Sequence, residues 1–577
     1  MPGLLVFLTP VAVLMATGTQ LSWLDNTIDP FIYVGTTERL GDYLARWPET
    51  YYPYRFGYIL PAQLTDWLFG DIGGYVVLRM AFLGLIGLLV WPRRGRWSGR
   101  QLAIAAMGAA IYALSPLVQR AAFTGYTPTG TAFFVVSIAL IVPTLDRRDM
   151  AVWRFVAAGA TSGLAWNSHP TVLPVAIVCT TVLLVDQLVE GRGRNLVAAI
   201  VRGLAWLLGM GVVIGAAWAY LGTRYDAWDL YGSMFGQASK DTDSVFLEQT
   251  ATWFTWRHYL LVGPLALVIG LIAHRVTIDA GVRRSLRRLV LVTAASLAVF
   301  AVFQWFLDTP LLSIYYYSCI PLALATFLLA RSVAAIVSER ASGAAFWIAP
   351  AVVALLVGIL LLGREVKAGY TVIALAAVVV TIAGMAAALD DARRRSAASR
   401  VRAVVGALAV LLLAGYVSTS SPHDFPGSNP GFRVDPIYDS SMFTYDQSGL
   451  DVYRLAYDYA DYVPDLADEP GNFRVWFRRF ESGYTNQVQA TLVHGMTALQ
   501  PFPDGGLPDL TPFEVARIRQ ENLRYVIVVD SDPLVVTAGV RALEGADLGF
   551  AVKRSTTFDE GGLAVTVAIM ERTPTAG

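Results

Sequence analysis

The sequence predicts an α-helical protein that crosses a membrane many times and ends in a small α/β domain. Of its 577 residues, 55% are hydrophobic and only 15% are charged, and the mean hydropathy is +0.51. A soluble globular domain carries roughly a quarter charged residues. Apolar runs close to the ~20 residues that a helix needs to cross a bilayer recur along the first 420 residues. Beyond them, helix and strand patterns alternate.

The apolar runs predict about thirteen membrane-spanning helices. The run nearest the N-terminus lacks the basic region and the small-residue cleavage site of a signal peptide, so we expect a retained first span. Very short connections separate two pairs of spans, at 167–170 and 308–310. The predicted spans are 3–21, 72–91, 101–119, 127–144, 151–167, 170–188, 197–220, 258–273, 287–307, 310–330, 345–363, 370–389 and 402–419.

The distribution of Lys and Arg predicts the orientation of these spans. Basic residues accumulate in short cytoplasmic loops, and the short loops of this chain alternate between Arg-rich and Arg-poor when the N-terminus lies in the cytoplasm. The outer side of a plasma membrane then receives the loop 22–71, the loop 221–257 and everything after about residue 420. The formal net charge is zero, so the total charge gives no support to nucleic-acid binding.

The two long outer loops combine aromatic rings with polar groups, a composition typical of the membrane–water interface. The first loop contains two amphipathic stretches, at about 29–48 and 56–69. We therefore expect this loop to lie on the membrane. The region 1–420 is the predicted transmembrane domain.

The region after residue 420 predicts a linker followed by an α/β domain. Residues 421–448 are rich in Ser, Pro and Gly. In the domain, 449–577, we expect helices at 449–462 and 511–520, the latter with Thr511 as N-cap and Pro512 at its first position. Strands are expected at 473–477, 525–529 and 563–570.

Two carboxylates follow the first predicted span and are candidates for chemistry. Asp25 and Asp29 are four residues apart, so they share a face if this turn is helical. A carboxylate beside the membrane can take the proton of an acceptor hydroxyl as general base. The alternative for Asp29 is a helix N-cap before Pro30, which is compatible with a catalytic role.

A second set of candidates consists of cations around the second outer loop. Lys240 lies inside this loop, and Arg257 and His258 lie where it meets the next span. Such groups can stabilise a departing phosphate by charge-assisted hydrogen bonds. The alternative is that Arg257 and His258 are interfacial anchors whose charged ends reach toward water.

Two further patterns lie at the outer ends of spans. Asn167-Ser168-His169-Pro170 is polar where polar groups are costly, which favours a function; the alternative is a tight turn with a hydrogen-bonded His. An aromatic belt is sufficient to explain Tyr315-Tyr316-Tyr317.

The sequence contains no paired Cys/His spacing that would mark a zinc site, and Cys179 and Cys319 are expected to be buried in apolar surroundings. No cofactor follows from the sequence. Oxygen ligands such as Asp25, Asp29, Asp241 and Asp243 could hold Ca²⁺ or Mg²⁺.

The segment Asp29-Pro30-Phe31-Ile32-Tyr33 resembles an acidic motif of the GT-C superfamily of membrane glycosyltransferases, in which Asp-Glu-x-x-Tyr often follows the first span. Asp29 and Tyr33 match in spacing, whereas Pro30 replaces the Glu. The stretch Tyr51-Tyr52-Pro53-Tyr54-Arg55 also looks like first-loop sequence of bacterial members, which include protein O-mannosyltransferases of family 39 and actinobacterial arabinofuranosyltransferases. High Ala, Val, Gly and Arg contents favour a high-GC bacterium such as an actinobacterium.

The resemblance covers roughly residues 1–420. It implies a GT-C-like fold, a polyprenyl-phosphate sugar donor, a cell-envelope glycan, lipid or protein acceptor, and inversion at the anomeric carbon. It also implies that Asp29 is the catalytic base, with Asp25 as the second candidate. The candidate substrate-binding residues are Tyr33, Tyr52, Arg55, His169, Lys240, Arg257 and His258.

The main alternative function is a transporter or flippase of a lipid-linked saccharide. Transporters place substrate sites near the bilayer midplane, often at broken helices in related halves. The predicted spans have few ionisable residues at their centres and show no internal repeat, which favours chemistry at the membrane surface. A scaffold or sensor would not require a carboxylate pair in a large interfacial loop.

Overall fold

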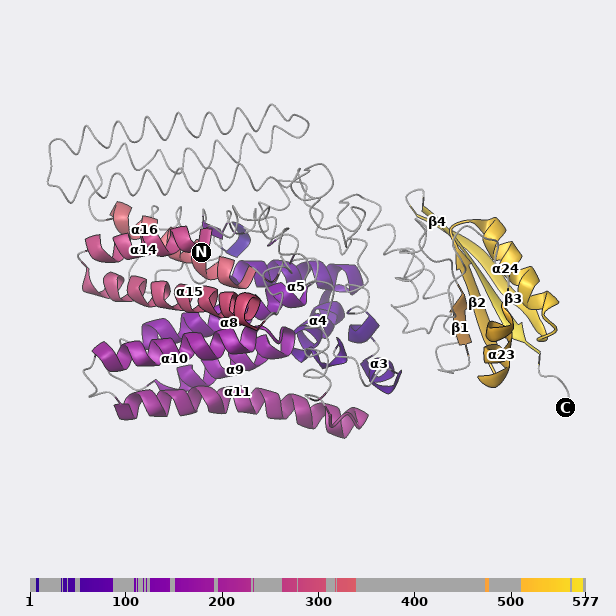
Figure 1. Ribbon diagram of the computed structural model, residues 1–577, viewed down its shortest axis with the longest axis horizontal. Coiled ribbons are helices and arrows are strands. Elements are labelled where there is room, and N and C mark those ends of the chain that lie inside the picture. The colour runs from indigo at the N-terminus through magenta and orange to yellow at the C-terminus, as the bar shows by residue number, and fades with distance from the viewer. Residues whose placement is uncertain are drawn as a thin grey trace, which may run out of the picture. The chain divides into compact units, whose positions relative to one another are not determined.

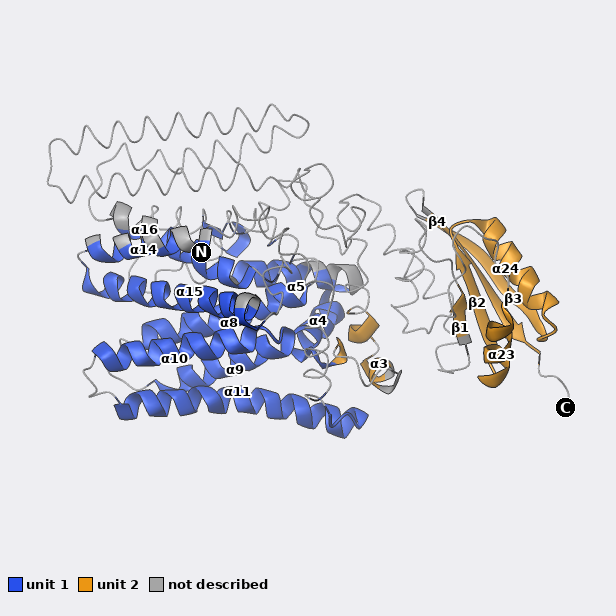
Figure 2. Cartoon of the chain, in the orientation of Figure 1, with its two compact units in different colours: residues 1–21, 54–437 blue, residues 22–53, 438–577 orange. Residues whose placement is uncertain are grey.

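The computed structural model divides the chain into two compact units, Met1–Leu21 with Tyr54–Ile437 and Ser22–Pro53 with Tyr438–Gly577 (Figure 2). The structure describes residues 7–9, 33, 35–38, 40–46, 52–86, 125–145, 151–190, 196–229, 262–277, 279–307, 317, 319–338, 473–476, 510–560 and 563–573, and the single positions 108, 109, 112, 118, 121 and 232. The linker predicted at 421–448 and the helix predicted at 449–462 lie outside these residues.

The first unit is helical, and its long helices run side by side (Figure 1). Its described helices are α4 (Phe56–Phe69), α5 (Asp71–Ile86), α8 (Tyr126–Thr144), α9 (Val152–Ser168), α10 (Val172–Glu190), α11 (Leu196–Tyr225), α14 (Val262–Val276), α15 (Ala280–Phe306) and α16 (Cys319–Ser338). A short 3-10 turn, η1 (Tyr52–Tyr54), precedes α4, and the helix α3 (Leu40–Arg46) belongs to the other unit.

Four of the described helices, α8, α10, α11 and α15, are long and apolar enough to cross a membrane, and a shorter apolar stretch covers Cys319–Ser332 of α16. The helix α4 coincides with the second amphipathic stretch expected in the first loop. The predicted spans 3–21, 101–119, 345–363, 370–389 and 402–419 lie wholly or mostly outside the described residues, so the count of thirteen stays a prediction.

Several predicted boundaries were wrong by five to nine residues. The helix α11 continues through Tyr225, five residues into the predicted second outer loop, and α15 begins at Ala280, seven residues before the predicted start. The span predicted at 310–330 is α16, Cys319–Ser338. A hydropathy profile detects only the apolar part of a helix, so it cannot predict polar turns that continue the same helix.

Close backbone contact holds α9 against α11. A Cβ atom on Gly159 would lie 1.8 Å from the Trp206 carbonyl oxygen, and one on Gly209 would lie 1.9 Å from the Val156 carbonyl oxygen. Small residues at such crossings let membrane helices approach closely. A hydrogen-bonded chain extends across the same crossing, since Trp206 Nε1 donates to Ser162 Oγ at 3.2 Å and this hydroxyl donates to Ser137 Oγ of α8 at 2.9 Å.

An ionic cluster with a buried centre joins α8, α10 and α15: Arg288 and Asp186 are buried, whereas the side chains of Arg287 and Glu190 are 33% and 25% exposed. Arg287 Nη2 lies 2.7 Å from Asp186 Oδ1 and 2.6 Å from Glu190 Oε1. Arg288, which is 1% exposed, lies 3.0 Å from Glu190 Oε2 through Nη2 and donates through Nη1 to the Val142 carbonyl oxygen at 3.1 Å. Arg288 also lies 3.4 Å from Asp186 Oδ2 through Nε, so both guanidinium groups face both carboxylates, which compensates charges that would be expensive to bury alone.

The C-terminal part of the second unit contains a four-stranded sheet in the order β1-β2-β4-β3 (Figure 1). Its strands are β1 (Phe473–Trp476), β2 (Tyr525–Asp530), β3 (Phe550–Glu560) and β4 (Leu563–Arg572). The strand β1 is parallel to β2, whereas β4 is antiparallel to both β2 and β3. The three predicted strands are confirmed as β1, β2 and β4, and β3 was not predicted.

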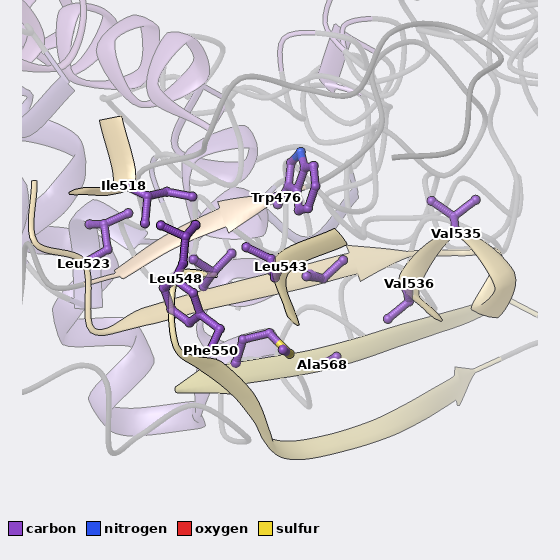
Figure 3. Packing of buried hydrophobic residues seen from close by; sticks show 12 residues of the cluster. Trp476, Ile518, Leu523, Val535, Val536, Leu543, Leu548, Phe550 and Ala568 are labelled. Carbon is purple, nitrogen blue, oxygen red and sulfur yellow. The ribbon is translucent and has the colours of Figure 1, made fainter. Parts of the chain in front are cut away.

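Two helices, α23 (Pro512–Gln520) and α24 (Pro533–Gly545), cover one face of this sheet over an apolar core. Figure 3 shows side chains from both layers meeting, among them Trp476 of β1, Ile518 of α23, Leu543 of α24 and Phe550 of β3. The predicted start of α23 is confirmed: Thr511 is the N-cap, Pro512 follows it, and Thr511 and Glu514 form a capping box.

Candidate functional site

Three helices of the first unit begin at one cluster of side chains. Arg55 is the residue before α4, Tyr126 is the first residue of α8, and His169 lies in the turn that leads into α10. The free N–H groups and the dipole of a helix N-terminus favour negative charge. The sequence therefore places a cation, an aromatic ring and an imidazole where three such N-termini meet.

Glycines bring these helix ends together. A Cβ on Gly57 would lie 1.9 Å from the Leu164 carbonyl oxygen of α9, so α4 passes directly against the end of α9. Gly125 precedes α8 with φ +69°, a conformation that suits glycine, and a Cβ there would lie 2.8 Å from the Tyr58 ring. Larger residues at either position would separate Arg55 from the turn that contains His169.

Arg55 is buried and stacks on Tyr126. Its guanidinium carbon lies 3.8 Å from the centroid of the Tyr126 ring, and the residue is 4% exposed. A desolvated guanidinium over an aromatic face gains from the cation–π interaction. Because guanidinium stays protonated in proteins, this site carries a permanent positive charge.

His169 lies beside the same ring. Its imidazole stacks on Tyr126 at a centroid distance of 5.5 Å and meets the Tyr317 ring edge-on at 4.3 Å. The Nδ1 atom lies 2.5 Å from the Thr171 hydroxyl. Burial, and secondarily the charge of Arg55, hold the pKa of His169 well below its usual value, so the imidazole is neutral at pH 7.

Arg79 is a further buried cation, and the sequence reasoning missed it. It comes from α5 and is 2% exposed. Burial raises the pKa of the Tyr58 hydroxyl, while the nearby charge of Arg79 works in the opposite direction. An ionisable residue inside a predicted span is by default a functional candidate, and this signal could have identified Arg79 in the run 72–91.

The two tyrosines predicted to bind substrate lie together in the second unit. The Tyr33 and Tyr52 rings meet edge-to-face with centroids 5.4 Å apart, and Tyr33 is fully buried. The Thr37 hydroxyl donates to the Tyr33 carbonyl oxygen at 2.7 Å. The ring contact joins the acidic-motif tyrosine to Tyr52.

The remaining predicted site residues lie outside the described residues. These are the carboxylates Asp25 and Asp29 and the cations Lys240, Arg257 and His258. Within the described part of the chain, no group of three or more His, Cys, Asp or Glu side chains could hold a metal ion. Cys179 and Cys319 are buried free thiols, as expected.

The described cluster has the chemistry of a site for an anionic, hydroxyl-rich ligand. Arg55 supplies charge, His169 supplies neutral hydrogen-bonding atoms, and Tyr126 and Tyr317 supply aromatic surface. Charged hydrogen bonds of this kind recognise phosphate. The turn at residues 167–170 is a tight turn with a hydrogen-bonded His, as one of the two readings expected, and the functional reading of it stays a prediction.

No family model and no curated protein matches the chain. Among solved structures, the chain is similar to two crystal structures of ArnT from Cupriavidus metallidurans. The ArnT structure bound to undecaprenyl phosphate has a TM-score of 0.45 and 14% sequence identity, with 97% of each chain covered. The apo ArnT structure has a TM-score of 0.45 and 15% identity, again with 97% of each chain covered.

Proposed function

We propose that this protein is a membrane glycosyltransferase that moves a sugar from a polyprenyl-phosphate-linked donor to a cell-envelope glycan, lipid or protein at the outer face of the membrane. The observation that carries the proposal is the buried stack of Arg55, Tyr126 and His169 in a bundle of apolar helices. A lipid-linked phosphate needs a cation held at apolar helices, and a sugar needs neutral hydrogen-bonding and aromatic groups beside it.

In the proposed reaction, the Asp29 carboxylate takes the proton of an acceptor hydroxyl. The hydroxyl oxygen attacks the anomeric carbon from the face opposite the phosphate, the bond from this carbon to the phosphate oxygen breaks, and the polyprenyl phosphate leaves with the bonding electrons. The configuration at the anomeric carbon is therefore inverted. Asp25 is the second candidate for the base.

Arg55 is assigned to the leaving group in this proposal. The phosphate gains negative charge as the bond to the sugar breaks, and a fixed guanidinium in a water-poor site stabilises that charge more than water does. Lys240, Arg257 and His258 are assigned to the same phosphate from the second outer loop.

The proposal is tested by comparing the wild type with Asp29→Asn and Asp25→Asn in a membrane transfer assay. The donors are radiolabelled polyprenyl-phosphate pentoses and hexoses, including arabinofuranosyl and mannosyl donors because of the sequence resemblance. Detergent melting temperatures and membrane yields control for folding. We expect transfer by the wild type and loss of transfer in Asp29→Asn at unchanged stability.

Two other outcomes would redirect the proposal. Full activity of Asp29→Asn together with an inactive Asp25→Asn would move the base to Asp25. Movement of intact lipid-linked saccharide across vesicle membranes, without transfer from any donor, would support the transporter alternative and overturn the proposed enzyme.

A further inference from the structure

The turn between α9 and α10 presents two buried polar atoms that have no hydrogen-bond partner in the described part of the chain. These are Oδ1 of Asn167 and Nε2 of His169. Asn167 is fully buried and His169 is 1% exposed. Polar atoms buried in this way are rare in native proteins, and each calls for an explanation.

The other polar atom of each side chain already holds the residue in place. Asn167 Nδ2 donates to the Gly163 carbonyl oxygen at 2.9 Å, within α9. His169 Nδ1 pairs with the Thr171 hydroxyl at 2.5 Å. In each residue, one polar atom is hydrogen-bonded within the protein and holds the side chain in place, and the other polar atom can bind a ligand. This is the arrangement of a preorganised binding group.

The chemistry of the two atoms selects a ligand with neutral hydroxyl groups. The amide oxygen of Asn167 accepts hydrogen bonds, and Nε2 of a neutral imidazole donates or accepts according to its tautomer. A hydroxyl can satisfy either. The Tyr317 ring, which meets His169 edge-to-face and is only partly buried, offers aromatic surface that complements the apolar C–H groups of a sugar ring.

We propose that Asn167 and His169 form a sugar-binding subsite. These two residues would bind hydroxyls of the donor sugar, while Arg55 binds the phosphate of the donor. This proposal rests on the proposed function. The division follows from the cluster itself, since Arg55 and His169 are separate side chains, one charged and one neutral, that share the Tyr126 ring.

The two amide replacements of His169 provide a matched pair for the test. In His169→Gln, the amide reaches toward the place of Nε2, whereas in His169→Asn it takes the place of Nδ1 and leaves the Nε2 position empty. The readouts are the KM for the radiolabelled polyprenyl-phosphate sugar and the affinity for sugar-free polyprenyl phosphate, measured in detergent by quenching of tryptophan fluorescence. The second readout does not require transfer.

We expect His169→Asn to raise the KM tenfold or more and to leave the affinity for sugar-free polyprenyl phosphate within twofold of the wild type. His169→Gln should recover most of the lost KM, and Asn167→Leu should resemble His169→Asn. Arg55→Lys should weaken the binding of both lipids. A variant that binds the sugar-linked lipid less well but sugar-free polyprenyl phosphate as well as before would not be expected if the role of His169 were purely structural.

Three results would overturn the subsite. The first is an unchanged KM in His169→Asn. The second is a loss of affinity for sugar-free polyprenyl phosphate in His169→Asn that is as large as the rise in its KM for the sugar-linked lipid. The third is a rise in KM in His169→Gln as large as in His169→Asn. If the wild type transfers sugar but any of these results is found, the proposed function stands and the subsite alone fails. If the wild type neither transfers sugar nor binds polyprenyl phosphate, both proposals fail together.

Discussion

The guanidinium of Arg55 lies 3.8 Å from the centroid of the Tyr126 ring, and the same ring stacks on His169 at 5.5 Å. A permanent charge and a neutral imidazole thereby share one aromatic partner. Burial keeps both from water, which strengthens their electrostatic interactions with a ligand. Burial, and secondarily the positive charge of Arg55, lowers the pKa of His169, so His169 stays neutral.

The first prediction concerns the shape of the Arg55 side chain. Arg55→Lys keeps the charge but loses the planar, forked donor and its stacking on Tyr126. A charge-assisted hydrogen bond contributes about 1.5–3 kcal/mol, so we expect kcat/KM for the lipid-linked donor to fall roughly ten- to hundredfold. The steady-state transfer assay measures this change.

The control for Arg55 is Arg154→Lys, because Arg154 also lies over an aromatic ring, that of Trp153, at 5.2 Å. Trp153 is 64% exposed and lies at the start of α9, away from the described cluster in sequence. Wild-type kinetics are expected for this variant. An equal effect of the two Lys variants would show that general loss of Arg stacking, and not the Arg55 site, lowers activity.

The sequence singled out Arg55 and His169 separately but did not predict that they lie together. Arg55 followed from a resemblance of first-loop sequence, and His169 from polar residues between two apolar runs. Their proximity depends on Gly57 docking α4 against α9 and on Tyr126 standing between them. Packing of segments far apart in the chain leaves no periodic signal in the sequence.

The C-terminal sheet shows a second limit of sequence reasoning. The strand β2, Tyr525–Asp530, is buried on both faces and reads as a continuous apolar run, so it was predicted. The strand β3, Phe550–Glu560, is the edge strand and is polar and mostly exposed. Polar residues protect an edge from pairing with other chains, and they also remove the hydrophobic pattern by which a strand is predicted.

The second prediction concerns the crossing of α9 and α11. Gly159→Ala places a methyl group where a Cβ would lie 1.8 Å from the Trp206 carbonyl oxygen, so the two helices must separate. Overpacking of this kind costs about 1–3 kcal/mol. We expect a lower melting temperature in detergent, measured by fluorescence of the intact protein.

Gly211→Ala on α11 is the matched control, because no heavy atom lies within 4 Å of a Cβ there. Replacing glycine by alanine in a helix is expected to stabilise by roughly 0.5–1 kcal/mol where space is free. The two variants should therefore move the melting temperature in opposite directions. Equal shifts of the same sign would contradict the close contact at Gly159.

The third prediction concerns the ionic cluster of α10 and α15. Arg288→Met removes the guanidinium that contacts Glu190 and the Val142 carbonyl oxygen and leaves Arg287 to face two carboxylates. Breaking a buried ion pair by removing one partner costs about 3–5 kcal/mol. We expect a strongly lowered melting temperature that high salt changes little, since buried pairs are weakly screened.

Arg283→Met tests whether position in the cluster, and not charge alone, produces this loss. Arg283 belongs to the same helix, α15, but is exposed. Surface substitutions of this type usually change stability by less than about 0.5 kcal/mol. If Arg283→Met is as destabilising as Arg288→Met, the buried cluster is not what holds α10 against α15.

The last prediction concerns pH. The pKa of His169 is held below its usual value in the folded protein, first by burial and then by the charge of Arg55, which faces the same Tyr126 ring. In the unfolded chain, His titrates near its ordinary pKa of about 6.5. Below that pH the unfolded state takes up a proton that the folded state refuses, so acidification favours unfolding. Above pH 7 the imidazole is neutral in both the folded and the unfolded state, so it does not contribute to the pH dependence of stability.

We therefore expect the melting temperature of the wild type to fall between pH 7 and pH 5 more steeply than that of His169→Gln, whose side chain does not titrate. Between pH 7 and pH 8 the two slopes should agree. The difference isolates His169 because all other titrating groups are shared by the two proteins. Parallel curves over the whole range would mean that His169 accepts its proton in the fold, and a folded imidazolium beside Arg55 would contradict the neutral pair described above.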